Sequence, residues 1–319
     1  MPALKYHQGQ VTVQREANTT VIADNLSRWV GPVGEFTSIA DMILFATAAQ
    51  DGTLQFTLLS GKAPLVQTVP GGGDPAVHGH DQRLRLRLPA QAGALTAGMS
   101  CGGLSINLAQ ARRARVNGKL VRQDDALDLV ADETFTLCRK YMAPSLSLHP
   151  EQMVGPGIRE PVGLDDPFVT QVLARGETTF LASISPTGMP DVAHRGGLPG
   201  FVKLDIASRK LTWTEYLGDG IFKSAGNVRA TGTLTLLVPD MATGNAVEFV
   251  GRGEYKNIRA SRRQRVDPLI QDKEPYPVQG VITCDIHKVF KLHRALNPRQ
   301  LVDAETITSC DSPDEQAPQ

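Results

Sequence analysis

The chain has 319 residues, with 33 lysines plus arginines and 33 aspartates plus glutamates, so its formal net charge is zero. This length is sufficient for two hydrophobic cores, and the balanced charge gives no support to a nucleic-acid or membrane-surface partner. No run approaches the roughly 20 apolar residues of a membrane span, and the N-terminus lacks the apolar core of a signal peptide. The four cysteines form no CxxC pair, which suits a reducing compartment. We expect a soluble, cytoplasmic protein.

The first half of the chain is expected to be rich in β-strands. Residues 45–61 have the pattern of a hairpin, and residues 103–119 predict a strand, a polar turn and a returning strand. Between them, residues 83–88 alternate arginine with leucine, which predicts a strand whose arginines face solvent. A further strand is predicted over residues 132–141.

Prolines and glycines mark the centre of the chain. Residues 149–163 contain three of each without apolar periodicity, which predicts a linker over 149–164. A helix is expected directly after it, with Asp166 as N-cap and Pro167 in the first turn. Phe168, Val172 and Leu173 supply its apolar face.

The second half opens with a distinctive hairpin. An apolar run over 178–184 leads through the turn Pro186-Thr-Gly-Met189 into a strand that carries His194 and Arg195 to a glycine-rich bend. Glycines let the backbone approach a ligand closely, and an arginine beside them offers a planar fork of donors suited to phosphate. The next apolar run, 210–214, places Trp213 in the core.

The two halves repeat the same order of elements. The hairpin over 45–61 parallels 180–196, the segment 103–119 parallels 232–253, and 132–141 parallels 285–294. The offset drifts from about 130 to about 150 residues, which is the length of a domain. We interpret the chain as a duplication of one β-rich domain.

The sequence resembles the pyridoxamine 5'-phosphate oxidase-like family, the FMN-binding split barrels. Pro190-Asp-Val-Ala-His-Arg-Gly-Gly-Leu-Pro-Gly-Phe-Val202 is similar to the pattern P-D-V-S-H-R-G-G-x-P-G-F-V found in many members. A second segment, 214–227, is similar to Y-x-G-N-x-x-x-N-S-L-G-N and keeps Tyr216, Gly218, Ser224, Gly226 and Asn227. Asp219 and Gly220 depart from that pattern, in which asparagine and arginine are common.

The resemblance implies a mainly β fold with short helices and two split barrels in tandem, of which the first is degenerate. It covers residues 165–295 well and 35–145 weakly. The expected organisation is an N-terminal arm (1–34), a degenerate split barrel (35–148), the linker (149–164), an FMN-binding split barrel (165–302) and a disordered acidic tail (303–319).

The resemblance also implies an FMN site in the second barrel, with F420 or haem as less favoured cofactors. The phosphate requires cations, hydroxyls and backbone N–H groups. The implied cofactor-binding residues are His194, Arg195, Gly196, Lys203, Thr214, Tyr216, Lys223, Ser224 and Asn227. The first half has Leu59-Ser-Gly-Lys62 instead, so we expect it to be a structural partner that caps the site.

Other polar clusters give weaker signals. His78 and His80 have no nearby acidic or cysteine partners, so a loop is favoured over a metal site. The basic run over 259–265 is interpreted as a solvated face in preference to a site for a nicotinamide phosphate. The sequence contains no nucleophile elbow, dinucleotide fingerprint or P-loop.

We therefore expect an FMN-dependent oxidoreductase that transfers hydride or electrons through flavin N5 to a small-molecule substrate, with NAD(P)H as a candidate donor. The catalytic residues are not identified. The alternative is a non-catalytic split barrel that carries flavin, deazaflavin or haem, or has no cofactor. The tandem chain is expected to form either a homodimer or an intramolecular pseudo-dimer.

Overall fold

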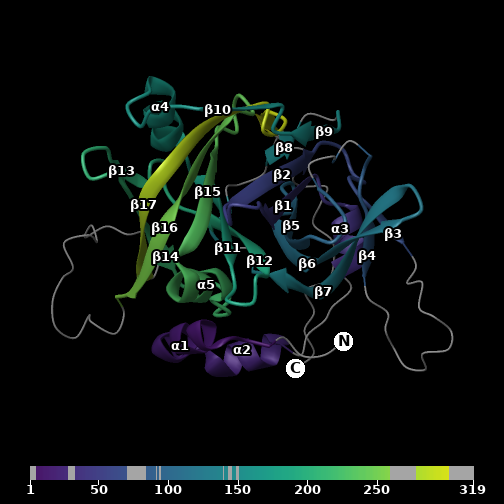
Figure 1. Ribbon diagram of the computed structural model, residues 1–319, viewed down its shortest axis with the longest axis horizontal. Coiled ribbons are helices and arrows are strands. Elements are labelled where there is room, and N and C mark those ends of the chain that lie inside the picture. Colours follow the sequence, from purple (N-terminus) through teal and green to yellow (C-terminus); the bar gives the residue numbers. More distant parts are fainter. Residues whose placement is uncertain are drawn as a thin grey trace.

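The computed structural model describes residues 5–27, 33–69, 84–90, 92, 95–138, 140–142, 146–148, 151–258 and 278–301. Figure 1 shows two strand-rich lobes side by side, with two N-terminal helices lying below the second lobe. The histidines at 78 and 80, the basic run at 259–265 and the acidic tail at 303–319 lie outside the described residues. No helix in the described ranges is long and apolar enough to cross a membrane.

The first lobe is built on one antiparallel sheet. Its strands run in the spatial order β3-β4-β7-β6-β5-β1-β2-β9. The elements are α3 (Val33–Ser38), β1 (Met42–Ala48), β2 (Leu54–Ser60), β3 (Gln67–Val69), β4 (Arg85–Arg87), β5 (Ser100–Asn107), β6 (Arg112–Gln123), β7 (Ala126–Leu137) and β9 (Met153–Gly155).

The second lobe is built on another antiparallel sheet. Its order is β12-β11-β15-β16-β17-β14-β13, with β10 paired to β17. The elements are β10 (Ile158–Pro161), α4 (Pro167–Arg175), β11 (Thr178–Ile184), β12 (Pro190–Gly196), β13 (Lys203–Asp205), β14 (Lys210–Tyr216), α5 (Lys223–Thr231), β15 (Thr233–Pro239), β16 (Ala246–Asn257) and β17 (Val278–His293).

The two sheets have the same topology. The order β2-β1-β5-β6-β7-β4-β3 becomes β12-β11-β15-β16-β17-β14-β13 when ten is added to each strand number. A helix precedes the first strand in both lobes, α3 before β1 and α4 before β11. The predictions of a mainly β chain, a duplicated domain and two barrels in tandem are therefore confirmed.

Two short strands lie within the segment that the sequence predicted to be a linker. β9 extends the first sheet by pairing with β2, and β10 pairs with β17 of the second sheet. Beyond these, β8 (Leu146–Leu148) pairs with β18 (Arg299–Leu301), which joins the end of the first lobe to the end of the second.

Several local predictions for the second lobe are confirmed. β11 and β12 form the predicted hairpin, whose turn is closed by the Ser185 N–H on the Met189 carbonyl. α4 is capped by Asp166, which accepts the Phe168 N–H at 2.8 Å. Trp213 is buried in the core.

The arginines of β4 are only partly solvent-facing: the side chain of Arg87 is 36 % exposed and that of Arg85 15 %, while Arg83 lies outside the described residues. Arg85 and Arg87 both reach Asp128 on β7, with N···O distances of 2.8 and 3.0 Å. Asp128 is fully buried, and such a carboxylate needs cationic or hydrogen-bonding partners. The alternating pattern indicated the strand correctly but could not show that a buried acid lies opposite it.

The two lobes share a hydrophobic core. Each lobe has its own apolar cluster, and a third cluster combines residues from both, including Leu44 and Leu58 from the first lobe and Phe180 and Val192 from the second. Burial of apolar surface is the main favourable contribution to folding. The lobes are therefore packed together as one unit.

Gly102 permits a close approach between the lobes. A Cβ at this position of β5 would lie 2.7 Å from the backbone of Pro190 and Asp191 on β12. We expect Gly102→Ala to lower the free energy of unfolding by about 1–3 kcal/mol, because backbone atoms must shift to admit the methyl group. Urea denaturation measures the loss. Gly157→Ala is the matched control, since a Cβ there would meet atoms only at 3.5 Å or more and should cost little.

Asp41, just before β1, makes stability depend on pH. Both its carboxylate oxygens accept the Leu108 N–H, but burial outweighs these bonds and raises its pKa from 3.8 to about 6. Because the folded-state pKa is raised, the protonated carboxyl contributes to the free energy of unfolding. This contribution is fully present below pH 3.8 and is lost as pH rises through 6.

We therefore expect wild type to lose stability relative to Asp41→Asn between pH 4 and pH 7. The difference should reach about 3 kcal/mol, since each pKa unit corresponds to about 1.4 kcal/mol. Urea denaturation of both proteins across this range measures it. If the difference in the free energy of unfolding between the two proteins stays constant over this pH range, burial does not destabilise the Asp41 carboxylate.

Candidate functional site

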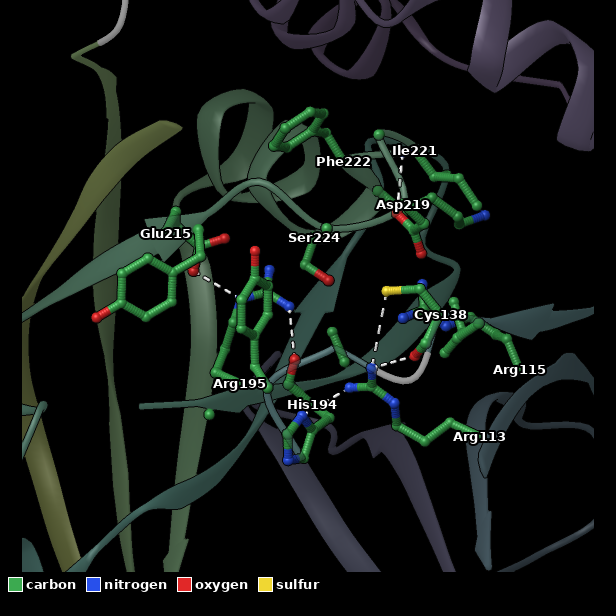
Figure 2. A pocket seen from close by; sticks show the side chains of 18 of the residues that line it. Arg113, Arg115, Cys138, His194, Arg195, Glu215, Asp219, Ile221, Phe222 and Ser224 are labelled. Atoms are coloured by element: carbon green, nitrogen blue, oxygen red, sulfur yellow. Dashed lines mark hydrogen bonds and ion pairs between the residues drawn. The ribbon is translucent and has the colours of Figure 1, made fainter. Parts of the chain in front are cut away.

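A pocket with a cavity of about 90 Å³ lies where the two lobes meet (Figure 2). The first lobe contributes β6, the end of β7 and the residues that follow it, and the second contributes β12, β14, the start of α5 and the loop between these last two. The lining residues are Arg113, Arg115, Leu137, Cys138, Tyr141, Ala193, His194, Arg195, Gly196, Thr214, Glu215, Tyr216, Gly218, Asp219, Gly220, Ile221, Phe222, Lys223 and Ser224.

Three polar residues of β6 point toward the second lobe. Arg113, Arg115 and Asn117 are two residues apart in a strand, so their side chains lie on one face. Their exposed fractions are only 6, 4 and 2 %. The sheet therefore delivers two buried guanidinium groups and a carboxamide to the contact between the lobes.

Arg113 determines the tautomer of His194 and favours its neutral form. Its Nη1 donates to the His194 Nδ1 at 2.7 Å, and its Nη2 donates to the carbonyls of Cys138 and Lys140. Because an arginine can only donate, His194 accepts at Nδ1 and carries its proton on Nε2. Burial, together with the charges of Arg113 and Arg195, lowers the pKa of His194 well below its ordinary value. The imidazole is therefore neutral.

Asp191 connects both lobes through a buried network. Its carboxylate accepts from Arg115 at 2.9 Å and from Asn117 at 2.9 Å, both on the first lobe. It also accepts from the Ser224 hydroxyl at 3.1 Å on α5. The Arg115 charge is thereby neutralised within the protein.

Arg195 is paired on the opposite side of the pocket. Its Nε donates to Glu215 Oε1 at 2.6 Å, and the same oxygen accepts from the Trp213 indole at 2.9 Å. Burial acts to lower the pKa of Arg195, but the charge and hydrogen bond of Glu215, together with the charges of Asp219 and Asp191, outweigh it, and the net shift is upward.

The start of α5 is held by the first lobe and by the N-terminal helices. Lys223 pairs with Glu133 of β7 at 2.5 Å. The Asn227 carboxamide oxygen accepts from His7 at 2.8 Å and from Gln10 at 3.0 Å, the latter on α1 (Gln8–Ala17). α1 and the following α2 (Thr20–Ser27) lie beneath α5 in Figure 1. α1 therefore packs on α5 of the second lobe.

The structure brings most of the predicted site residues together. Those that line the pocket are His194, Arg195, Gly196, Thr214, Tyr216, Lys223 and Ser224. Asn227 does not line the pocket; it is hydrogen-bonded to Gln10 of the N-terminal helix and to Ser183. Lys203 is exposed on β13 and does not line the pocket.

Gly196 meets a structural need of its own. A Cβ there would lie 1.8 Å from the Tyr141 carbonyl oxygen, so the strand can pass this carbonyl only with glycine. The two departures from the family pattern also have local roles. Asp219 accepts the Ile221 N–H at 3.0 Å, and Gly220 adopts a φ of +81° beside Thr19.

Sequence reasoning missed the contribution of the first lobe to the lining. Arg113, Arg115, Cys138 and Tyr141 all come from the half that was expected only to cap the site. The signal was the polar residue at every second position of 113–117, a pattern typical of a strand with one polar face. What the sequence could not show is which face meets the other lobe.

The fit of the pocket to a phosphate-bearing cofactor depends on which of its cations are free of carboxylate partners. Arg115, Arg195 and Lys223 each have a carboxylate within ion-pair distance. Arg113 has no carboxylate among its hydrogen-bond partners in the described part of the chain, and its Nε is buried without a partner. Burial lowers the pKa of Arg113. Arg113 thus fits an anionic group better than the other three cations, which are already paired, although the charge of Asp219 in the same lining partly compensates it. The cavity of about 90 Å³ has room for a phosphate but not for a whole flavin nucleotide.

No metal site accompanies the pocket: the described ranges contain no cluster of three or more histidine, cysteine, aspartate or glutamate side chains with metal-binding geometry. Cys101, Cys138 and Cys284 are free thiols.

Comparison with known proteins gives matches in structure alone. No protein-family model and no curated protein matches the chain. Among solved structures, HupZ of Group A Streptococcus matches with 18 % identity and a TM-score of 0.29, covering 39 % of this chain and 92 % of its own. HutZ, the heme storage protein of Vibrio cholerae, matches with 12 % identity and a TM-score of 0.28, covering 42 % and 100 %.

A third match is a protein of the pyridoxinephosphate oxidase family from Clostridium acetobutylicum. It has 13 % identity and a TM-score of 0.29, and covers 42 % of this chain and 92 % of its own. Each match covers less than half of this chain. The name of this last protein refers to the oxidase family that residues 190–202 resemble.

Proposed function

We propose that the pocket between the lobes binds the phosphate end of FMN, with Arg113 as the principal contact to the phosphate, and that the flavin ring lies outside the cavity of about 90 Å³. The observation that carries this proposal is a buried guanidinium that lines the pocket and has no carboxylate among its partners in the described residues. An isolated buried charge is costly unless an opposite charge compensates it. A phosphate supplies that charge together with oxygens that accept from guanidinium N–H groups.

The beginning of α5 supports the same assignment. Lys223 and Ser224 in its first turn line the pocket, and Phe222 at the N-cap provides no side-chain hydrogen bond to the helix. Free N–H groups and the positive end of the helix dipole favour an anion at this place. The phosphate is therefore proposed to lie between Arg113 and the first turn of α5.

The proposed activity is that of a flavin-dependent oxidoreductase acting on a small molecule. Bound FMN supplies hydride or electron transfer at its ring, while the protein orients and shields the cofactor. In this chain the neutral His194 carries its proton on Nε2, and the Tyr141 and Tyr216 rings, whose centroids are 5.3 Å apart, provide apolar surface beside the pocket. We propose NAD(P)H as the electron donor.

The visible spectrum of the purified protein tests this function. The protein is mixed with FMN, freed of excess by gel filtration and then titrated with NADPH and NADH without oxygen. A retained flavin spectrum that bleaches with either nucleotide supports an oxidoreductase. Retained flavin that neither nucleotide reduces would limit the function to flavin binding.

A second candidate function, a split barrel without a cofactor, is favoured by one observation. Arg195, Lys223 and Ser224 are all bonded to the protein's own carboxylates, so most of the expected phosphate ligands are already satisfied. In this case the polar network of the pocket only holds the two lobes together, and the pocket binds no cofactor. A protein that remains colourless after incubation with FMN would support this second candidate.

A further inference from the structure

The repeated topology predicts the position of a second pocket. The proposed FMN pocket is lined by Arg195 of β12, by Gly218 two residues after β14, and by Cys138 directly after β7. Exchanging the two lobes replaces these elements by β2, β4 and β17. A corresponding pocket should therefore be lined by the equivalent residues of those three strands.

The equivalent residues do line one cavity. Leu59 pairs with the second residue of β1 as Arg195 pairs with the second residue of β11. Pro89 is two residues after β4, and Arg294 directly follows β17. All three border a cavity of about 600 Å³. The second pocket thus lies where the duplication places it.

The chemistry of this second pocket differs from that of the first. The position of Arg195 is taken by Leu59, and the neighbouring His194 by Leu58. β9, which pairs with the edge of β2, adds Met153 and Val154 to the lining. Further lining residues are the apolar Phe56, Leu65 and Pro156 and the polar Thr57 and Gln152, so the lining is mixed.

Arg294 is the only charged residue among the described residues that line the second pocket. It is exposed, and no ion pair links its side chain to a carboxylate in the described part of the chain. A cavity that combines apolar side chains with a few polar groups and one charged group is the usual form of a small-molecule site, and about 600 Å³ lies within the range of about 300–1,000 Å³ for such sites.

We propose that the second pocket binds a small amphipathic monoanion, with an apolar body among the aliphatic side chains and a carboxylate on Arg294. The guanidinium fork suits a carboxylate, and burial of the apolar body supplies most of the affinity. This site is separate from the proposed FMN pocket and does not depend on flavin binding.

Calorimetric titration with decanoate tests the proposal on the full chain. Excess FMN in both solutions occupies the first pocket if it binds there. Decanoate should bind, and decyltrimethylammonium should bind at least about tenfold more weakly, because its charge opposes Arg294. Arg294→Gln should weaken decanoate binding about twofold to fivefold, as expected for an exposed ion pair.

Arg209→Gln is the matched control for Arg294→Gln. Both arginines are exposed and have a positive φ, 54° for Arg209 and 49° for Arg294, but Arg209 does not line the pocket. Decanoate affinity should be unchanged in the control. Equal weakening in both variants would overturn the role of Arg294.

A second measurement on the wild-type protein avoids any effect of mutation on folding. The chain has seven methionines, whose labelled methyl groups give separate NMR signals. Decanoate should shift the Met153 signal, identified with Met153→Leu, in a saturable way. Absence of a Met153 shift, or loss of decanoate binding in Arg113→Gln, would overturn the proposal, since the ligand would then not be in the second pocket.

Discussion

Replacing Asp191 by alanine is expected to lower the free energy of unfolding by about 3–5 kcal/mol. Asp191 is 1 % exposed and accepts from Arg115 and Asn117 of the first lobe and from Ser224 of the second. The variant leaves the Arg115 guanidinium buried without its carboxylate, and removal of one partner from a buried pair costs about this much. Urea denaturation followed by far-UV circular dichroism measures the change.

Asp285→Ala is the matched control for this prediction. Asp285 also pairs with a cation, Lys210, but both side chains are at least half exposed, and exposed ion pairs contribute about 1 kcal/mol or less. Similar small losses in the two variants would show that the Asp191 network does not hold the lobes together.

Replacing Arg113 by glutamine is expected to weaken FMN binding about tenfold to a hundredfold. The variant removes a charge-assisted hydrogen bond to the phosphate, which is worth about 1.5–3 kcal/mol. Glutamine keeps a donor for the Cys138 carbonyl, so the fold should persist. Quenching of flavin fluorescence on titration with the protein measures the dissociation constant.

The control for Arg113→Gln is Arg209→Gln, which removes the same charge at an exposed position outside the pocket. Riboflavin, which lacks the phosphate, provides a second comparison, because its affinity should be nearly unchanged by Arg113→Gln. Equal losses for FMN and riboflavin would place Arg113 away from the phosphate.

Much of the fold follows from local signals in the sequence. The hairpin turn at Pro186–Met189, the Asp166 cap of α4 and the core position of Trp213 are encoded by turn chemistry, capping and periodicity within a few residues. The duplication was also detectable, because the elements recur in the same order.

The candidate site was predictable only for the lobe that carries the family motif. Arg195 and Lys223 were identified as candidate ligands, but their carboxylate partners Glu215 and Glu133 were not. Glu133 lies on the other lobe, 90 residues away. Pairing over such a distance depends on how the two sheets pack, which no local pattern encodes.

The sequence also could not show which arginines of the first lobe are paired with carboxylates. Arg85 and Arg87 are paired with the buried Asp128, whereas Arg113 has no carboxylate among its partners in the described residues. All three occur in similar alternating strands of the sequence. Their environments differ because β4 lies toward one edge of the sheet, whereas β6 faces the second lobe.

Parallel titrations of the wild-type protein with FMN and riboflavin test the central claim most directly. The claim is that a buried cation between the lobes binds the flavin phosphate, and the two ligands differ only in that group. We predict that FMN binds at least about tenfold more tightly than riboflavin, and that the difference shrinks in Arg113→Gln. Equal affinities, or no binding of either ligand, would contradict the account.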